Sequence, residues 1–242
     1  MRTAFFIGIA CVLIATSCFR EDHCIRGEGN VETRTLELSP FSSIHLQGSM
    51  NVEIQYGDAQ KVVAVGHGNI IDELETEVID GIWYIGLGTG CFYNFDLKVY
   101  VTLPLLTRVS NNGSGDISIL DMPGTDHLEI RNQGSGEIRL NSVSTTRVLD
   151  VKIQGSGPVS FYKPWNDLDS LNITVNSSGK CEAFLLPAPA VTVHSSGSGD
   201  IEVNATGTLK VTIMGSGDVF YKGDPEIELD DKGSGKLLKS LF

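Results

Sequence analysis

The chain has 242 residues, of which 41% are hydrophobic, so it can bury a continuous core, and this excludes a disordered protein. Its formal net charge is -12, and its Lys and Arg residues do not cluster in the sequence. This excludes a nucleic-acid partner, because contacts to phosphates need clustered cations.

Residues 1–17 have the organisation of a secretory signal peptide. Arg2 supplies the positive start, and residues 4–15 form an apolar run that is too short for the roughly 20 residues of a membrane-spanning helix. Ala15-Thr16-Ser17-Cys18 is similar to a bacterial lipobox, which predicts cleavage before Cys18 and lipidation of that residue. Plain secretion is the alternative, because Ala15 stands where Leu is usual. Residues 18–30 are then a lipid-anchored tether.

Three cysteines remain if Cys11 is lost with the signal and Cys18 carries lipid: Cys24, Cys91 and Cys181. An exported compartment permits disulfides. We predict a bridge between Cys24 and Cys91, which would pin the tether to the N-terminal part of the folded domain. The alternative is three isolated, buried thiols. None of them has the spacing typical of zinc or redox sites.

Residues 31–104 predict irregularly spaced strands. Apolar and polar residues alternate over 31–56 and over 97–103, the pattern of half-buried strands. Between them, residues 69–77 are the only stretch that could be helical, but the stretch is too short to predict a helix. Asp80-Gly81 predicts a two-residue hairpin turn. Residues 47–54 are a degenerate copy of the repeat that follows, so the repeat architecture begins in the N-terminal part of the chain.

From residue 105 onward the chain repeats a Gly-Ser-Gly turn flanked by two short strands. The second glycine of successive turns, in one case Ser-Ser-Gly, stands at Gly115, Gly136, Gly157, Gly179, Gly199, Gly217 and Gly235. The spacings between them are 21, 21, 22, 20, 18 and 18 residues, which is the signature of a solenoid.

The repeat predicts an all-β fold: a right-handed parallel β-helix, or β-solenoid, with coils of about 20 residues stacked roughly 4.8 Å apart. Residues 31–240 then form a single head domain, irregular over 31–104 and regular over 105–240. We expect the turn glycines to adopt φ values that a Cβ would forbid. The residues expected to form an inward-facing column are Ile117, Ile138, Ile201 and Val219.

An acidic residue directly follows four of the turns: Asp116, Glu137, Asp200 and Asp218. Stacked carboxylates could hold calcium between coils. The alternative, which we favour, is that each short acid accepts hydrogen bonds from turn N–H groups and keeps the surface polar, with no metal bound. Pro158 and Lys180 interrupt the series.

Two aromatic segments interrupt the repeat. Residues 161–167 lengthen one coil and contain Tyr162 and Trp165, and residues 91–95 contain Tyr93. An exposed aromatic ring could stack on a sugar ring or on a partner side chain. The alternative is that Phe161 belongs to the core and Trp165 covers the edge of a coil.

These motifs together resemble a known family, the putative auto-transporter adhesin head domain, also called the GIN domain. The resemblance rests on the Gly-Ser-Gly-acid-hydrophobic units, on residues 214–225 and on Lys232-Gly233-Ser234-Gly235, and it covers about residues 31–240. It implies an exported β-solenoid, common in Bacteroidetes and often lipid-anchored, with adhesion as the suggested role. It supplies no catalytic residues to carry over.

We therefore expect a non-enzymatic outer-membrane lipoprotein of the bacterial cell envelope, facing the periplasm or the surface, whose head is an adhesin or a scaffold. Its expected partners are the membrane, through the lipid anchor, and a glycan or protein ligand; no cofactor is expected. The alternative is a carbohydrate-binding or polysaccharide-processing β-helix module. Catalysis is not favoured, because no cluster of His, Arg and Lys accompanies the carboxylates.

Overall fold

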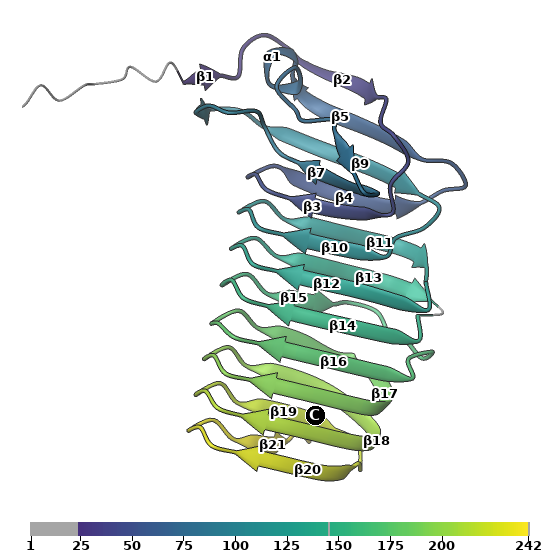
Figure 1. Ribbon diagram of the computed structural model, residues 1–242, viewed down its shortest axis with the longest axis vertical. Helices are drawn as coiled ribbons and strands as arrows, with labels where there is room; N and C mark the ends of the chain where they lie inside the picture. Colours follow the sequence, from purple (N-terminus) through teal and green to yellow (C-terminus); the bar gives the residue numbers. More distant parts are fainter. Residues whose placement is uncertain (1–23, 145, 242) are drawn as a thin grey trace, which may run out of the picture.

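The computed structural model describes residues 24–144 and 146–241, and almost all of its regular structure is β-strand. The strands stack as an elongated solenoid with two facing parallel sheets (Figure 1). As the chain descends in Figure 1, the near strands run toward the Gly-Ser-Gly corners and the far strands run away from them, which makes the coil right-handed. The predicted β-solenoid is confirmed.

The first sheet contains one strand from each coil, all paired in parallel. In stacking order these strands are β7 (Ile82–Ile85), β3 (Ser43–Leu46), β10 (Arg108–Asn111), β12 (His127–Asn132), β14 (Val148–Ile153), β16 (Ser170–Val175), the second halves of β17 (Cys181–Ser195) and β18 (Ile201–Ile213), and β20 (Glu226–Asp231). Each strand ends where a corner begins.

The second sheet contains the strands that leave the corners. In stacking order they are β9 (Leu97–Leu103), β4 (Asn51–Tyr56), β11 (Ile117–Pro123), β13 (Ile138–Ser144), β15 (Val159–Phe161), the first halves of β17 and β18, β19 (Val219–Lys222) and β21 (Leu237–Lys239). Parallel pairing in both sheets places equivalent residues of successive coils side by side.

An antiparallel cap closes the N-terminal end. β2 (Val31–Leu36) pairs with β5 (Lys61–His67), which pairs with β9, and the short helix α1 (Gly68–Ile71) follows β5. β6 (Val78–Ile79) and β7 form the predicted hairpin, with φ of 51° at Asp80 and 72° at Gly81. In the described part of the chain, no helix has the length and apolar character needed to cross a membrane.

The coils at the N-terminal end do not stack in chain order. The coil of β3 and β4 lies between the later coil of β7 and β9 on one side and that of β10 and β11 on the other. After β9, the chain therefore passes back across the first coil before it starts β10. The sequence pattern did not predict this arrangement, because it arises from long-range strand pairing.

The interior is a continuous apolar core, and the predicted inward column lies in it. Its residues Ile117, Ile138, Ile201 and Val219 are each 0% exposed. In register, Ile138 lies between Ile117 and Val159 of the neighbouring strands. The predicted column is confirmed, and it supplies much of the apolar burial that no single coil could achieve.

Replacement of Ile138 by alanine is expected to lower the free energy of unfolding by about 2 to 5 kcal/mol, because the cavity left between two coils cannot collapse fully. The outward-facing Ser118, on the strand next to Ile138, provides the control. The Ser118→Ala variant should change the stability by less than about 0.5 kcal/mol. Urea denaturation followed by circular dichroism measures both, and equal values would contradict the inward assignment of Ile138.

The corner glycines are required for a different reason from the one expected. Among the described glycines, positive φ occurs at Gly29, Gly81 and Gly223 and at none of the Gly-Ser-Gly corners. A Cβ on Gly136, however, would lie 2.0 Å from the carbonyl oxygen of Gly115 in the preceding coil. The prediction based on φ was wrong: glycine is needed because the backbones of successive corners touch.

Candidate functional site

The stacked corners form one long edge of the solenoid (Figure 1). A shallow groove lies on the N-terminal part of this edge, over four neighbouring corners. The groove has a volume of about 640 Å³ and is lined by Gln47, Gly48, Ser49, Asn112, Gly113, Ser114, Gln133, Gly134, Ser135, Gly155 and Ser156. None of these described lining residues is charged. The groove therefore offers amide and hydroxyl groups in a chain that carries 18 Lys and Arg and 30 Asp and Glu residues.

Most main-chain N–H groups of the corners are used within the protein. Those of Ser114 and Ser135 donate to the carbonyl oxygens of Gly48 (3.1 Å) and Gly113 (3.0 Å) in the preceding coil. Behind the corner, the buried Asn132 side chain donates to the Gly136 carbonyl at 2.8 Å and holds the turn from inside. The glycine-rich corners are thus not a phosphate-binding loop, because that function needs free N–H groups.

Where β7 ends, a longer loop replaces the corner. Its first part is Gly86-Leu87-Gly88-Thr89-Gly90, and it continues to Phe95. The Glu75 N–H donates to the Gly86 carbonyl, and the Gly88 N–H donates to the Glu73 carbonyl, both at 2.9 Å. These bonds tie the loop to the segment that follows α1 and fix its position.

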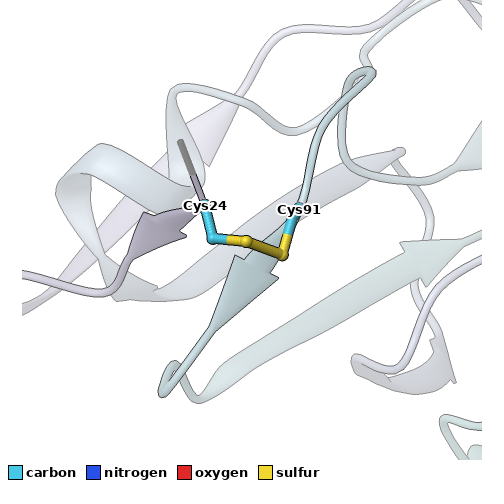
Figure 2. The surroundings of a disulfide bond; sticks show 2 residues. All are labelled: Cys24 and Cys91. Atoms are coloured by element: carbon cyan, nitrogen blue, oxygen red, sulfur yellow. A yellow bond between two sulfur atoms is a disulfide. The ribbon is translucent and has the colours of Figure 1, made fainter. Parts of the chain in front are cut away.

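A disulfide between Cys24 and Cys91 also holds this loop (Figure 2). The two cysteines lie next to the short parallel pair of β1 (Ile25–Arg26) and β8 (Phe92–Tyr93). The start of the described chain is therefore joined to the N-terminal end of the solenoid, at the loop that replaces the corner.

A pocket of about 370 Å³ lies beneath this loop. Its lining residues are Gln47, Gly48, Ser49, Met50, Glu75, Gly86, Leu87, Gly88, Thr89, Gly90, Phe92 and Phe95. The pocket shares Gln47, Gly48 and Ser49 with the corner groove, so the two adjoin at this corner. Its volume lies within the range of small-molecule sites, about 300 to 1,000 Å³.

Polar and apolar groups are separated within the pocket. A Cβ on Gly86 would lie 3.2 Å from Glu75 Oε2 and 3.5 Å from Gln47 Oε1, so these two side chains meet at Gly86. The apolar side is formed by Met50, which is 2% exposed, and by the partly buried rings of Phe92 and Phe95. The two rings pack edge to face, with centroids 6.4 Å apart.

A second cavity next to the pocket is acidic. It has a volume of about 530 Å³ and shares Gln47 and Glu75 with the pocket, and its other lining residues are Asp72, Glu73, Leu74, Thr76, Glu77, Ile79 and Tyr84. Of its carboxylates, that of Asp72 forms an ion pair with Arg34. The negative electrostatic potential of this cavity disfavours an anionic ligand in the adjacent pocket.

The sequence indicated only part of this site. Residues 91–95 were singled out as an aromatic loop, but Gln47, Glu75 and the glycines of 86–90 were not. The available signal was Gly86-Leu87-Gly88-Thr89-Gly90, which follows a strand at the place where a Gly-Ser-Gly corner is due. Glu75 approaches Gly86 through tertiary pairing, for which the sequence holds no local signal.

The four carboxylates that follow the turns are engaged with neighbouring coils. Asp116 Oδ1 accepts the Glu137 N–H at 2.9 Å, and Asp200 Oδ1 accepts the Asp218 N–H at 3.1 Å. Asp218 Oδ1 accepts the Lys236 N–H at 2.8 Å. These bonds to turn N–H groups are the structural role that was proposed as the alternative to calcium binding.

The structure does not bring all four carboxylates together. Coils with Pro158 and Lys180 at the equivalent position separate the first pair from the second. Arg139 forms ion pairs with both Asp116 (3.4 Å) and Glu137 (2.7 Å). Within residues 24–144 and 146–241, no group of three or more His, Cys, Asp or Glu side chains is placed to hold a metal ion.

The three candidate ligand-contact aromatics lie in different environments. Trp165 is 3% exposed and packs edge to face on Phe161, with centroids 5.3 Å apart, so its assignment as a ligand contact was wrong. Tyr162 is 54% exposed and donates to Glu137 Oε1 at 3.2 Å, and Tyr93 is 50% exposed in β8. Neither tyrosine lines the pocket or the groove.

Cys18 and the signal segment 1–17 lie outside the described residues. Cys181 is a free thiol in the inward column, in register with Val159 and Ile201. Complete burial raises the pKa of this thiol far above its ordinary value. A thiol in that state does not ionise and is chemically inert.

One pair of carboxylates has a feature that a hydrolase could use. Glu182 and Glu202 are register partners on adjacent strands, and burial, with a further contribution from the Glu182 charge, raises the pKa of Glu202. A raised carboxyl pKa beside a second carboxylate is typical of glycosidase acids. Neither residue lines the pocket or the groove, so a sugar bound there would not lie between them.

A family comparison agrees with this architecture. The model described as putative auto-transporter adhesin, head GIN domain, matches residues 40–225. The chain belongs to this family. The GIN-domain match takes in the pocket, the groove and the coils up to β19, and leaves out β2 and the last coil of β20 and β21. The range matched by the family model, 40–225, is therefore shorter than the range of 31–240 expected from the sequence.

Three solved structures similar to this GIN domain come from Bacteroidetes. A putative adhesin from Bacteroides fragilis is 27% identical, with a TM-score of 0.81 over 89% of this chain and 100% of that one. A putative lipid binding protein from Parabacteroides distasonis is 28% identical, with a TM-score of 0.72 over 89% and 99%. A putative adhesin from Parabacteroides merdae, 19% identical with a TM-score of 0.72 over 89% and 98%, shares the fold. No curated protein matches the sequence.

Proposed function

We propose that this chain is a non-enzymatic adhesion head of the bacterial cell envelope, held at the outer membrane by lipid on Cys18. The family and two of its similar solved structures carry the description adhesin, and an adhesin must be displayed on the outside of the membrane. The observation that carries the proposal is the attachment of residue 24 to the N-terminal end of a long, rigid solenoid. A tether at one end lets the rest of the solenoid project away from the membrane.

Lipidation is supported by the sequence around Cys18, where a short apolar run ends in small residues. A single acyl chain gives only marginal membrane binding, so stable anchoring needs the additional chains that lipoproteins carry. The tether between Cys18 and Cys24 is short and contains Arg20, Glu21 and Asp22. It would hold the cap of the solenoid close to the membrane surface.

A hydrolytic function is the weaker candidate. The observation in its favour is the raised pKa of Glu202 beside Glu182. Those two residues, however, line neither the pocket nor the groove. Binding without turnover requires only a surface with fixed groups, and a stacked solenoid supplies one without a moving part. The proposed role is therefore attachment, with no cofactor.

The test is adherence of a non-adherent Gram-negative host that expresses the full chain. Cells with the wild-type chain should adhere to immobilised extracellular material, and protease should remove the protein from intact cells. The Cys18→Ala variant should lose both cell association and adherence, because it lacks the anchor. A surface-exposed chain that confers no adherence would overturn the proposal, and so would release of reducing sugar from bound polysaccharide.

A further inference from the structure

We infer that the pocket beneath residues 86–95, together with the corner groove that adjoins it, binds a neutral oligosaccharide. One terminal ring would occupy the pocket, and the following rings would run along the groove past Ser114 and Ser135. This inference rests on the proposed adhesive function and names its ligand class and its site.

The free polar groups of the site match hydroxyl groups. Among the described residues, the Gln47 amide, the Glu75 carboxylate and the hydroxyls of Ser49 and Thr89 have no hydrogen-bond partner within the protein. The amide and the carboxylate are adjacent at Gly86, so together they can donate to and accept from one hydroxyl-bearing ring. The groove extends this set with further amides and hydroxyls and adds no charge.

The apolar side of the pocket matches the C–H face of a sugar ring. Met50, Phe92 and Phe95 line the same pocket as the Gln47 amide and the Glu75 carboxylate and supply apolar atoms to it. Such a pocket, with a few polar groups that fix orientation, is typical of ligand sites. Aromatic rings combine a large contact area with rigidity, which makes them effective for such contacts. A sugar ring has hydroxyl groups at its edge and an apolar C–H face, so it can contact both the polar and the apolar groups of the pocket.

The charges argue against an anionic ligand. Glu75 lies in the pocket, Glu73 and Glu77 line the adjacent cavity, and the chain carries a formal net charge of -12. A peptide strand is disfavoured for another reason. It would need a continuous row of unpaired main-chain groups, but most N–H groups of the corners are already bonded from coil to coil.

The site is rigid before any ligand binds. The loop is fixed by the Cys24–Cys91 disulfide, by the two main-chain bonds to residues 73 and 75, and by a bridge between Leu74 and Leu87. A preformed site avoids the free-energy cost of ordering a loop on binding. Such rigidity suits a neutral ligand, for which no strong ionic contact could offset that cost.

The experiment is a glycan array of neutral and acidic oligosaccharides probed with the purified full chain and three variants. Gln47→Ala removes the amide. Gly90→Ala adds a methyl group above the Phe92 ring, where the nearest atoms lie 3.6 Å from the new Cβ, so the fold tolerates it. The matched control is Gln154→Ala, which changes the same residue type at the equivalent corner position three coils away. Gln154 lines neither the pocket nor the groove, and its side-chain oxygen accepts a hydrogen bond from Gln133 at 2.8 Å.

The wild-type chain is expected to bind neutral oligosaccharides. Gln47→Ala and Gly90→Ala should each weaken that binding by about tenfold or more, because a desolvated hydrogen-bonding group is lost or the pocket is partly filled. Gln154→Ala should stay within about twofold of wild type. Unchanged melting temperatures would show that all three variants are folded.

Three results would overturn the inference. Binding of a neutral oligosaccharide that survives both Gln47→Ala and Gly90→Ala places the site elsewhere and leaves the adhesive function standing. If cells adhere but the purified chain binds only acidic glycans or only protein, the inferred ligand class is wrong and the adhesive function stands. Absence of both glycan binding and adherence overturns this inference together with the proposed function.

Discussion

The Gly136→Ala variant is expected to lose more than about 3 kcal/mol of its free energy of unfolding. The new Cβ would lie 2.0 Å from the Gly115 carbonyl oxygen and 2.6 Å from the carbonyl carbon, so it collides with backbone that cannot rotate away. Overpacking against mobile side chains costs about 1 to 3 kcal/mol, and a collision with two stacked backbones exceeds that range. Urea denaturation followed by circular dichroism measures the loss.

Ser135→Ala is the control for this substitution. It changes the exposed residue between the two glycines of the same corner, where the side chain has no partner among the described residues. Its expected effect is below about 0.5 kcal/mol. If Gly136→Ala were as harmless as Ser135→Ala, the close approach of the corners could not be the reason for glycine at this position.

Removal of the disulfide is expected to cost about 4 kcal/mol. The bridge joins residues 67 apart in sequence, and the loss follows from the loop-closure entropy that it removes from the unfolded chain. The variant with both Cys24→Ser and Cys91→Ser should therefore unfold at a lower urea concentration than the wild type. Paired replacement avoids leaving a reactive single thiol.

A thiol reductant provides the control for this comparison. It should lower the stability of the wild type to that of the double variant and leave the double variant unchanged, because the remaining Cys181 is buried and free. Equal stabilities of the oxidised wild type and the double variant would contradict the prediction. So would a fall in the stability of the double variant on addition of the reductant.

The features that could be predicted from the sequence are those with a local signal. The strand alternation around Ile138 showed which side chains face inward, and Asp80-Gly81 marked the hairpin because few residues accept positive φ. The repeat spacing indicated parallel coils, since only stacking buries their apolar faces.

The features that could not be predicted depend on long-range contacts. Nothing in the spacing indicates that the coil of β3 and β4 lies between two later coils, and a turn rich in glycine looks the same whether φ or close approach requires it. Trp165 could equally have been exposed or buried, because the sequence alone does not show whether Phe161 packs against it. The pocket combines Gln47, Glu75 and Gly86 from separate segments, and only folding brings them together.

The Cys24–Cys91 bridge also determines how mechanical tension would enter the head. A pull between the tether and the coils beyond Cys91 reaches Cys24 and passes across the disulfide, so residues 25–90 lie in a covalently closed loop outside that load path. That loop contains the antiparallel cap, the first coil, and ten of the twelve residues that line the pocket, all but Phe92 and Phe95. Tension applied to the later coils would therefore load β9 and those coils, while most of the pocket keeps its resting shape. Tension applied to a ligand in the pocket would instead pass through the pocket itself.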